Sequence, residues 1–193
     1  MNDIVNNHLP ELLTELESKC VEIGFTMPSD RMIGSLLKTL ITSKPDARLL
    51  ELGTGIGLSL CWMLEGMDSG SRLTSIDNDP ELIAIAKNYF GTDPRLNLMC
   101  TDGSEWLKNY KGEKFDLIFA DAWPGKYSEI EIALSLIKPG GFYVIDDMTP
   151  QPNWPEGHQE KASALLEFLE DRTDLVLTRL HWSTGVVIAT KRE

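Results

Sequence analysis

The sequence predicts an α/β fold: a doubly wound, mostly parallel sheet of seven strands that ends in an antiparallel hairpin. Short apolar runs, several of which end in an acidic residue, alternate with longer segments whose apolar residues recur at helical spacing. The last two runs, 175–180 and 186–190, instead flank the turn-forming sequence Ser183-Thr184-Gly185. Strands that alternate with helices form a parallel sheet covered on both faces, and a terminal hairpin adds an antiparallel edge.

The stretch from Leu49 to Ser59 reads L-L-E-L-G-T-G-I-G-L-S and joins the first predicted strand to a helix. Gly53, Gly55 and Gly57 stand at alternate positions within it. Glycine reaches positive φ without strain and lets a ligand approach bare backbone, and the first N–H groups of the helix face such a ligand. The spacing G-x-G-x-G differs from the G-x-G-x-x-G of dinucleotide-binding turns. We therefore predict a ligand site at this turn.

Two helices are predicted before the glycine turn, each with an apolar stripe. The stripe residues are Val5, Leu9, Leu12 and Leu16 in the first helix and Met32, Ile33, Leu36, Leu37, Leu40 and Ile41 in the second. Pro10 is tolerable only in a first turn, and Ser29, after the turn at Met27-Pro28, is the candidate N-cap of the second helix. Because Pro45 ends that helix, we predict a helical appendage over residues 1–44 and a core over 45–193.

Downstream of the glycine turn, strands and helices alternate along the chain. The later strands are predicted at 73–76, 96–99, 115–120, 142–145, 175–180 and 186–190. The helices are predicted to begin at Asp79-Pro80, to pass through Trp106 and Leu107, to carry Ile130, Ala133, Leu134 and Ile137, and to carry Ala162, Leu165, Leu166 and Leu169. The segment 148–160, with Pro150, Pro152 and Pro155, is predicted as a long loop that shapes a binding wall and contains His158.

Length and composition limit the classes of protein that this chain can be. A chain of 193 residues suggests one domain, 1–193. A net charge of −12 disfavours a nucleic-acid partner, and no apolar run approaches the roughly 20 residues of a membrane span. The N-terminus shows no signal-peptide pattern, and Cys20, Cys61 and Cys100 lie in apolar patterns without disulfide spacing. We therefore expect a cytoplasmic protein with three reduced cysteines in or near the core.

Acidic residues gather where the predicted parallel strands end. Glu51, Asp77, Asp121 and the pair Asp146-Asp147 stand at these positions, and Asp102 follows another strand. Ligands of such sheets bind beyond the carboxyl ends of the strands, and folding alone does not require acids there.

These motifs resemble the class I S-adenosylmethionine-dependent methyltransferases, and more narrowly the catechol and caffeoyl-CoA O-methyltransferase family. The resemblance covers roughly residues 27–192. It rests on the glycine stretch, S-I-D-N-D-P at 75–80, F-A-D-A-W-P-G-K-Y at 119–127 and V-I-D-D-M at 144–148. It implies a Rossmann-like sheet and S-adenosylmethionine as the cofactor.

The resemblance also implies a set of cofactor contacts. Asp77 would bind the ribose hydroxyls, Gly53 and Gly55 would admit the methionine portion, and Trp123 would stack on adenine. The full implied set is Met27, Ser29, Glu51, Gly53, Thr54, Gly55, Ser59, Asp77, Asn78, Asp102, Gly103, Ser104, Asp121 and Trp123. Several of these also have a purely structural interpretation, such as helix capping by Asp102 or a core position for Trp123.

A metal centre is predicted at Asp121, Asp146 and Asp147, because three carboxylates suit Mg²⁺ or another hard divalent cation. The family more often has asparagine where this chain has Asp147. The alternative is that Asp121 orients the cofactor while the aspartate pair forms a solvated turn.

The catalytic candidates are Asp121, Lys126 and His158. The catechol enzymes carry a lysine, thought to be the base, where this chain has Pro124, and Lys126 is the only lysine of that loop. His158 titrates near neutral pH and is a base or substrate contact on one interpretation and a surface residue on the other.

We predict methyl transfer to a hydroxyl oxygen of a small molecule, with an aromatic diol as the acceptor that a metal would favour. The alternatives are a methyltransferase acting on nitrogen or on a tRNA base, an NAD-dependent oxidoreductase, and a non-catalytic nucleoside-binding module. The glycine spacing argues against the oxidoreductase. The oligomeric state stays open, with a homodimer as one candidate.

Overall fold

The computed structural model describes residues 8–151 and 154–193, so the predictions for Val5 and Pro152 lie outside the described residues. It holds seven strands in one sheet with the order β3-β2-β1-β4-β5-β7-β6, which confirms the predicted α/β class. The chain forms two compact units, of which the first ends at Asp102 and the second is Gly103–Glu193. The prediction of a single domain stays a prediction.

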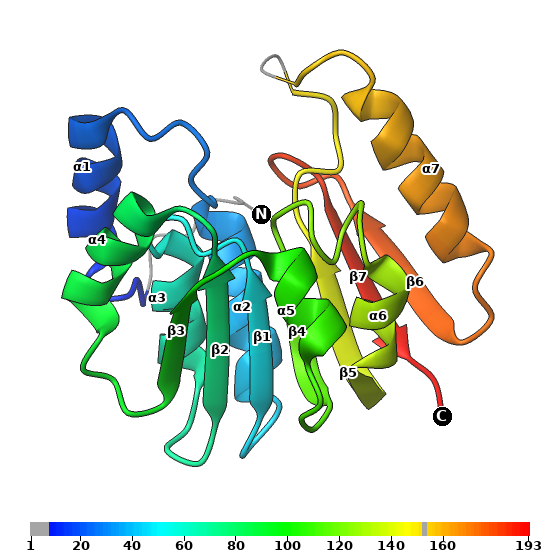
Figure 1. Cartoon of the computed structure of the whole chain (residues 1–193), viewed down its shortest axis with the longest axis horizontal. Helices are drawn as coiled ribbons and strands as arrows, with labels where there is room; N and C mark the ends of the chain where they lie inside the picture. The colour runs from blue at the N-terminus through cyan, green and yellow to red at the C-terminus, as the bar shows by residue number, and fades with distance from the viewer. Residues whose placement is uncertain (1–7, 152–153) are drawn as a thin grey trace. The chain divides into compact units, whose positions relative to one another are not determined.

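Over its described residues, the first unit contains a parallel three-stranded segment of the sheet and four helices, drawn from blue to green in Figure 1. Its elements are α1 (Leu13–Ile23), α2 (Arg31–Thr42), β1 (Arg48–Leu52), α3 (Leu58–Gly66), β2 (Arg72–Asp77), α4 (Pro80–Phe90) and β3 (Leu96–Cys100). Strand β2 pairs with β1 on one side, where Leu50 lies opposite Thr74, and with β3 on the other. Helices α1 and α2 pack on α3, so the residues predicted as an appendage belong to this unit.

Two helix starts in the first unit differ from the prediction. Helix α1 begins at Leu13, after Pro10, and buries Leu13, Leu16 and Cys20, whereas the prediction placed Leu12 on the buried face. Helix α2 is capped by Asp30, whose carboxylate accepts hydrogen bonds from the amides of the next turn, and the predicted cap Ser29 lies one residue earlier. A carboxylate at the cap also interacts favourably with the positive end of the helix dipole.

The second unit, where the structure describes it, contains parallel and antiparallel strands with three helices. Its elements are α5 (Gly103–Asn109), β4 (Phe115–Ala120), α6 (Ile130–Ser135), β5 (Ile137–Ile145), α7 (His158–Glu170), β6 (Leu175–Leu180) and β7 (Val186–Lys191). Strand β5 pairs parallel with β4 and antiparallel with β7, and β7 pairs antiparallel with β6. This order confirms the predicted antiparallel hairpin at the end of the sheet.

Two predictions in the second unit are wrong. Ile137 begins β5 and pairs with Phe115, so it does not belong to the preceding helix. The glycine pair that follows Pro139 lies inside β5, where the pairing register with β4 shifts. His158 is the first residue of α7, after Gly157 at φ +80°, so it does not lie in the loop. The apolar stripe of α7 starts four residues later, at Ala162, so the apolar pattern did not predict that the first turn of α7 is helical.

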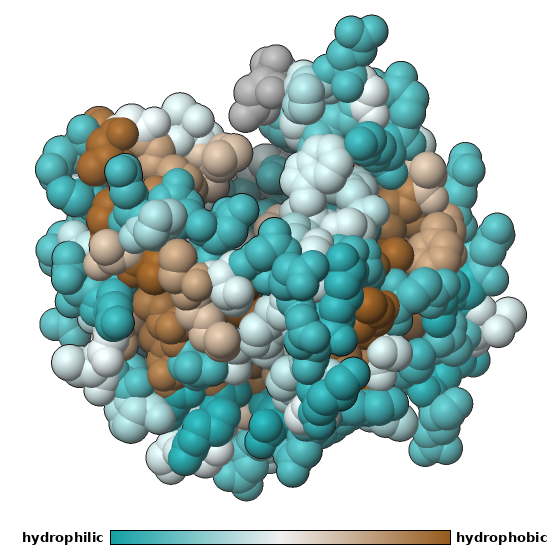
Figure 2. Space-filling view, in the orientation of Figure 1, coloured by the Kyte–Doolittle hydropathy of each residue, from teal (hydrophilic) through white to brown (hydrophobic). Residues whose placement is uncertain are grey.

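The core is apolar, and the drawn face of the surface is mostly hydrophilic with scattered apolar patches (Figure 2). Cys20 and Cys61 are buried, as predicted, but Cys100 is exposed at the end of the edge strand β3. All three are free thiols. Over the part of the chain that the structure describes, no helix combines the length and the apolar character needed to cross a membrane.

Candidate active site

The glycine turn after β1 has the backbone conformation that its composition requires. Gly53, Gly55 and Gly57 have φ of +102°, +53° and +102°. A Cβ added to Gly57 would lie 2.6 Å from Cε2 of Phe90, so the turn also packs too tightly for a side chain at that position. Gly57 is the N-cap of α3 and supplies no side-chain cap, so the first amides of α3 depend on other partners.

Asp77, at the end of β2, is hydrogen-bonded to this turn. Its Oδ2 accepts from the Gly55 amide at 2.8 Å, and its Oδ1 accepts from the Asp79 amide at 3.0 Å. Asp79 in turn caps α4. A carboxylate has about four lone-pair sites, so Asp77 keeps acceptor capacity beyond these two bonds.

Glu51 is fully buried beneath the turn and is held by hydroxyl groups. Ser59 Oγ donates to Glu51 Oε1 at 2.6 Å, Ser75 Oγ donates to Oε2, and Thr54 Oγ1 lies 2.6 Å from Ser75 Oγ. Burial raises the pKa of Glu51 to about 7, with a smaller upward effect of Asp77, while the two serine hydrogen bonds act in the opposite direction. This network fixes the floor of the turn, and neither Glu51 nor Ser59 is exposed to contact a ligand directly.

Of the other predicted cofactor residues of the first unit, all but Thr54 are at least partly exposed. Met27 is 68% exposed, Asn78 and Asp102 are exposed, and Ser29 is half-buried just before α2. Thr54 is buried and belongs to the hydroxyl network. The structure thus brings together the glycine turn and Asp77, and it leaves the side chains of Met27 and Asn78 exposed.

In the second unit, α5 begins with two of the predicted residues. Gly103 is buried at the start of the helix. The Ser104 hydroxyl donates to Oε2 of Glu129 and lies 3.3 Å from Ser128 Oγ. Lys108 lies 3.4 Å from the other carboxylate oxygen of Glu129. The Ser104 side chain is therefore engaged within this unit.

Four rings and a lysine form an aromatic cluster in the second unit, which comprises Trp123, Tyr127, Trp154, His158 and Lys161. The Trp154 and His158 rings lie 4.3 Å apart, and the Trp123 ring meets those of Tyr127 and His158 edge-on. Lys161 Nζ lies 4.4 Å from the centre of the Trp123 ring, of which about half is exposed. The cluster is a partly exposed aromatic surface with the Lys161 cation over the Trp123 ring.

The His158 side chain is held inside this cluster by a hydrogen bond with Tyr127. Its Nε2 lies 3.1 Å from the Tyr127 hydroxyl, and its Nδ1 is buried with no hydrogen-bond partner among the described residues. Burial lowers the pKa of His158, with a further lowering by Lys126, so the imidazole is neutral at pH 7. Burial also raises the pKa of Tyr127 to about 12.

The loops after β4 and β5 carry the three predicted metal ligands together with Lys126. The Lys126 side chain is buried, and its Nζ donates to the main-chain oxygen of Asp146 at 2.6 Å and to that of Asp147 at 3.3 Å. Burial lowers the pKa of Lys126, while the charges of Asp121, Asp147 and Asp146 raise it.

The carboxylate of Asp146 is buried and takes part in local bonds. Its Oδ1 accepts from the Asp147 amide at 2.8 Å and from Thr184 Oγ1 at 2.7 Å. Asp147 has φ +53°, which a non-glycine residue adopts at some cost. Within residues 8–151 and 154–193, no set of three His, Cys, Asp or Glu side chains has the arrangement of a metal site.

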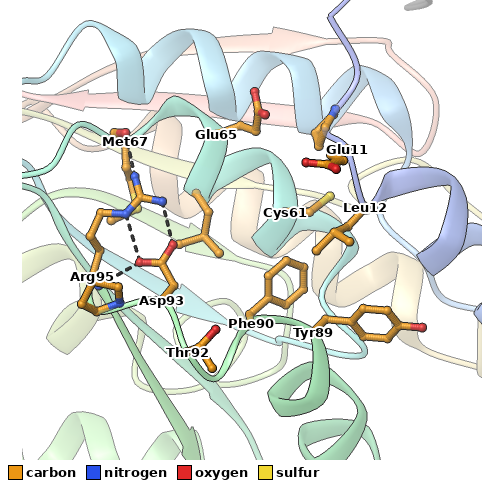
Figure 3. Close-up of a pocket in the computed structure, with 13 residues that line it drawn as sticks. Glu11, Leu12, Cys61, Glu65, Met67, Tyr89, Phe90, Thr92, Asp93 and Arg95 are labelled. Atoms are coloured by element: carbon orange, nitrogen blue, oxygen red, sulfur yellow. Dashed lines mark hydrogen bonds and ion pairs between the residues drawn. The ribbon is translucent and has the colours of Figure 1, made fainter.

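A pocket of about 700 Å³ lies elsewhere in the first unit, among α1, α3 and α4 (Figure 3). It is lined by Cys61, Tyr89 and Phe90, and by the ion pair of Arg95 with Asp93 at 2.7 Å. None of the predicted site residues lines it. It therefore does not correspond to the predicted cofactor site.

Sequence reasoning missed several side chains that hold the site. Ser75 supports Glu51, Tyr127 binds His158, and Thr184 binds Asp146. Tyr127 directly follows Lys126 in the motif at 119–127, so its place in that motif could have marked it as a site residue. Ser75 and Thr184 act across strands and turns distant in sequence, and only the pairing of the sheet reveals them.

The sheet order, the glycine turn after β1 and the acid after β2 define a doubly wound α/β protein with the features of a nucleoside-binding turn. The O-methyltransferase family profile matches residues 4–173, and the chain belongs to this family. A curated relative from Mycobacterium avium, whose name assigns it provisionally to the O-methyltransferases, is 33% identical over 139 residues. That alignment covers 69% of this chain, and the chain spans only 62% of the relative's length.

Solved structures share the fold at low sequence identity. An O-methyltransferase from Bacillus cereus in complex with SAH has a TM-score of 0.82 at 21% identity, over 97% of this chain and 94% of that chain. An O-methyltransferase from Streptomyces achromogenes, involved in tomaymycin synthesis and solved with SAM, has a TM-score of 0.82 at 22% identity, over 95% and 90% of the two chains. Both likenesses concern the fold.

Proposed function

We propose that the chain catalyses methyl transfer from S-adenosylmethionine to a hydroxyl oxygen of a small molecule. The observation that carries the proposal is the hydrogen bond of 2.8 Å from the Gly55 amide to the Asp77 carboxylate. It joins a turn of positive-φ glycines to an acid at the end of the next strand, which is the arrangement that receives a ribose in nucleoside-binding folds. Membership of the O-methyltransferase family supports the same function.

The first unit would hold the cofactor. When bound, S-adenosylmethionine supplies a methyl group that its sulfonium already activates for transfer. Asp77 would accept hydrogen bonds from the ribose hydroxyls with the lone pairs that Gly55 and Asp79 leave. Gly53 and Gly55 would admit the methionine portion against bare backbone, since their positive φ values fit the required close approach. Glu51 and Ser59 would position this turn from below.

The second unit would contact the acceptor. The half-exposed ring of Trp123, with Trp154 in the same cluster, offers a flat surface for an aromatic acceptor. This supports an aromatic hydroxyl compound as the acceptor class. A vicinal diol has less support, because it was predicted from a metal that would hold two oxygens. The roles of Gly103, Ser104, Asp121 and Trp123 as cofactor contacts stay predictions.

The acceptor hydroxyl must lose its proton as the methyl group is transferred. His158 is neutral at pH 7 because burial lowers its pKa, and its Nε2 lies 3.1 Å from the Tyr127 hydroxyl. We assign the uptake of this proton to the pair of half-buried residues, with His158 as the base. Lys126 is a poor candidate for the base, since its ammonium is fixed on two carbonyl oxygens.

A divalent cation at Asp121, Asp146 and Asp147 fits these residues poorly. The donor set has the right chemistry, since carboxylate oxygens are the ligands that Mg²⁺ prefers. However, Lys126 brings a positive charge to the same place, and Asp146 Oδ1 accepts two hydrogen bonds already. We therefore derive no step through a metal ion.

The remaining predictions concern the acceptor, the location and the assembly of the chain, and they are proposals. An acidic chain with a net charge of −12 fits a small-molecule acceptor better than a tRNA base. A cytoplasmic location and a homodimer stay expectations. Transfer to nitrogen stays the alternative, and the acceptor screen below distinguishes it.

Two variants that remove one charge each would test the assignment of Asp77. Calorimetry should show that the chain binds S-adenosylmethionine and its demethylated product and does not bind NAD. Asp77→Asn should weaken cofactor binding by about 1.5–3 kcal/mol, which is roughly tenfold to a hundredfold in Kd. Asp79→Asn keeps a good helix cap two residues away and should change Kd by less than about twofold.

The melting temperature of both variants controls for loss of the turn, since Asp77 also holds the Gly55 amide. Equal loss of affinity in both variants, or unchanged affinity in Asp77→Asn, would contradict the assignment. Transfer of labelled methyl groups to a panel of phenols, catechols and amines then tests the reaction itself. Labelling of amines alone would favour the N-methyltransferase.

A further inference from the structure

Lys126, predicted as a catalytic residue, places a positive charge beside the predicted metal ligands Asp121, Asp146 and Asp147. Its side chain is 4% exposed. Its Nζ donates at 2.6 Å to the main-chain oxygen of Asp146, which belongs to the loop after β5, although Lys126 itself lies in the loop after β4. The ammonium therefore links the two loops that carry the three carboxylates.

The loop holds Lys126 in this position through several backbone bonds. The Gly125 amide donates to the Ser128 oxygen at 2.7 Å, and the Lys126 and Tyr127 amides donate to the Trp123 oxygen at 3.2 and 2.9 Å. The buried Tyr143 hydroxyl, from β5, donates to the Gly125 oxygen. A tight turn anchored on the sheet thus presents the lysine, so its location is built into the fold.

The charges around Lys126 are those that a divalent cation would meet. Asp121, Asp146 and Asp147 all act electrostatically on the ammonium. A metal ion bound to these carboxylates would have to lie near a fixed positive charge in a buried environment, where screening by water is weak. The same charge already offsets part of the mutual repulsion of the three acids.

We propose that Lys126 serves as a built-in cation of the Asp121, Asp146 and Asp147 cluster, and that it makes this cluster a poor site for divalent metal ions. A side chain supplies the charge that a metal would supply and holds the two loops together through the carbonyl oxygens. Removing the charge should therefore create metal affinity that the natural chain lacks. This inference concerns metal binding and does not depend on the proposed methyl transfer.

Titration calorimetry with MgCl₂ and MnCl₂ would test the proposal on the full chain. The natural chain should show no saturable binding up to about 1 mM metal. Lys126→Gln keeps an N–H donor for the Asp146 oxygen but removes the charge, and it should bind Mn²⁺ at least roughly tenfold more tightly. Lys126→Arg keeps the charge and should behave like the natural chain.

Two further variants make the comparison specific. Lys138→Gln removes a lysine that pairs with Asp116 at 2.8 Å elsewhere in the same unit, and it should gain no affinity. Adding Asp146→Asn to Lys126→Gln should abolish the gained binding. Saturable binding to the natural chain that Asp147→Asn removes would overturn the proposal, as would a folded Lys126→Gln variant that gains no affinity.

Circular dichroism establishes whether Lys126→Gln is folded. If it is not, the natural chain decides the question, because a metal that binds only the folded state raises the melting temperature. A melting temperature unchanged by 10 mM Mn²⁺, a concentration far above roughly millimolar affinity, supports the proposal. A rise that Asp121→Asn abolishes refutes it.

Discussion

The buried acid Glu51 should make the chain less stable as pH rises toward neutrality. Burial raises its pKa in the folded chain from the ordinary value of 4.5 to about 7. Between these two pH values the unfolded chain gives up the Glu51 proton while the folded chain keeps it. Because the unfolded state then binds fewer protons than the folded state, the free energy of unfolding falls with increasing pH across this window.

The size of the effect follows from the two pKa values. Each pKa unit corresponds to about 1.4 kcal/mol, so the contribution of Glu51 should fall by about 3 kcal/mol between pH 4.5 and pH 8. Glu51→Gln imitates the protonated acid in shape and in having one side that donates, an NH₂ in place of the O–H, and one carbonyl side that accepts. Its stability should therefore lack this part of the pH dependence.

Urea unfolding of the natural chain and of Glu51→Gln at pH 5, 6, 7 and 8 would measure the difference. Other titrating groups are common to both proteins and cancel in the comparison. Glu156→Gln, which changes an exposed glutamate, is the matched control and should follow the natural chain. Parallel pH profiles for the natural chain and Glu51→Gln would refute the reasoning.

Three further predictions follow from the described geometry. Gly57→Ala should lower the free energy of unfolding by about 1–3 kcal/mol, because φ is +102° and the new Cβ would lie 2.6 Å from Phe90. A urea titration that shows less than half of this loss would contradict the steric argument. Asp30→Ala should cost about 1 kcal/mol in the same assay and Ser29→Ala much less, and the reverse order would mean that the cap is misassigned. His158→Ala should lower kcat at neutral pH and flatten an acid limb that lies below pH 6.5, because burial lowers the pKa of that histidine; an unaltered profile would remove it as the base.

The sheet could be predicted from sequence because its signals are local. Each strand of the first unit is a short apolar run next to a turn or capping residue, and Asp79-Pro80 marked the start of α4 correctly. The prediction for Ile137 was wrong because an apolar residue that follows a helical stripe fits the end of a helix as well as the start of a strand. Its pairing with Phe115, 22 positions away, decides the matter, and no local pattern records that pairing.

The candidate site could be predicted in its residue types but not in its bonds. The glycine turn and Asp77 are adjacent to strands whose ends meet, so their proximity follows from parallel topology. The role of Lys126 does not follow, because the side chain reaches main-chain oxygens 20 and 21 positions away, and main-chain atoms leave no trace in composition. Placing His158 in the helix similarly depends on a left-handed Gly157.

The C-terminal hairpin turn carries a bond to Asp146 whose consequence reaches beyond folding. The loop after β5 continues alongside this turn, since the Met148 amide donates to the Gly185 oxygen at 2.9 Å and the Thr149 amide to the Thr184 oxygen at 2.8 Å. A Cβ at Gly185 would lie 2.2 Å from Thr149 Oγ1, so the two segments are in close contact. Trp154 of this loop belongs to the surface proposed above for the acceptor. Under that proposal, changes at the hairpin turn should shift acceptor selectivity in directed evolution, through the shape of the loop that the turn supports.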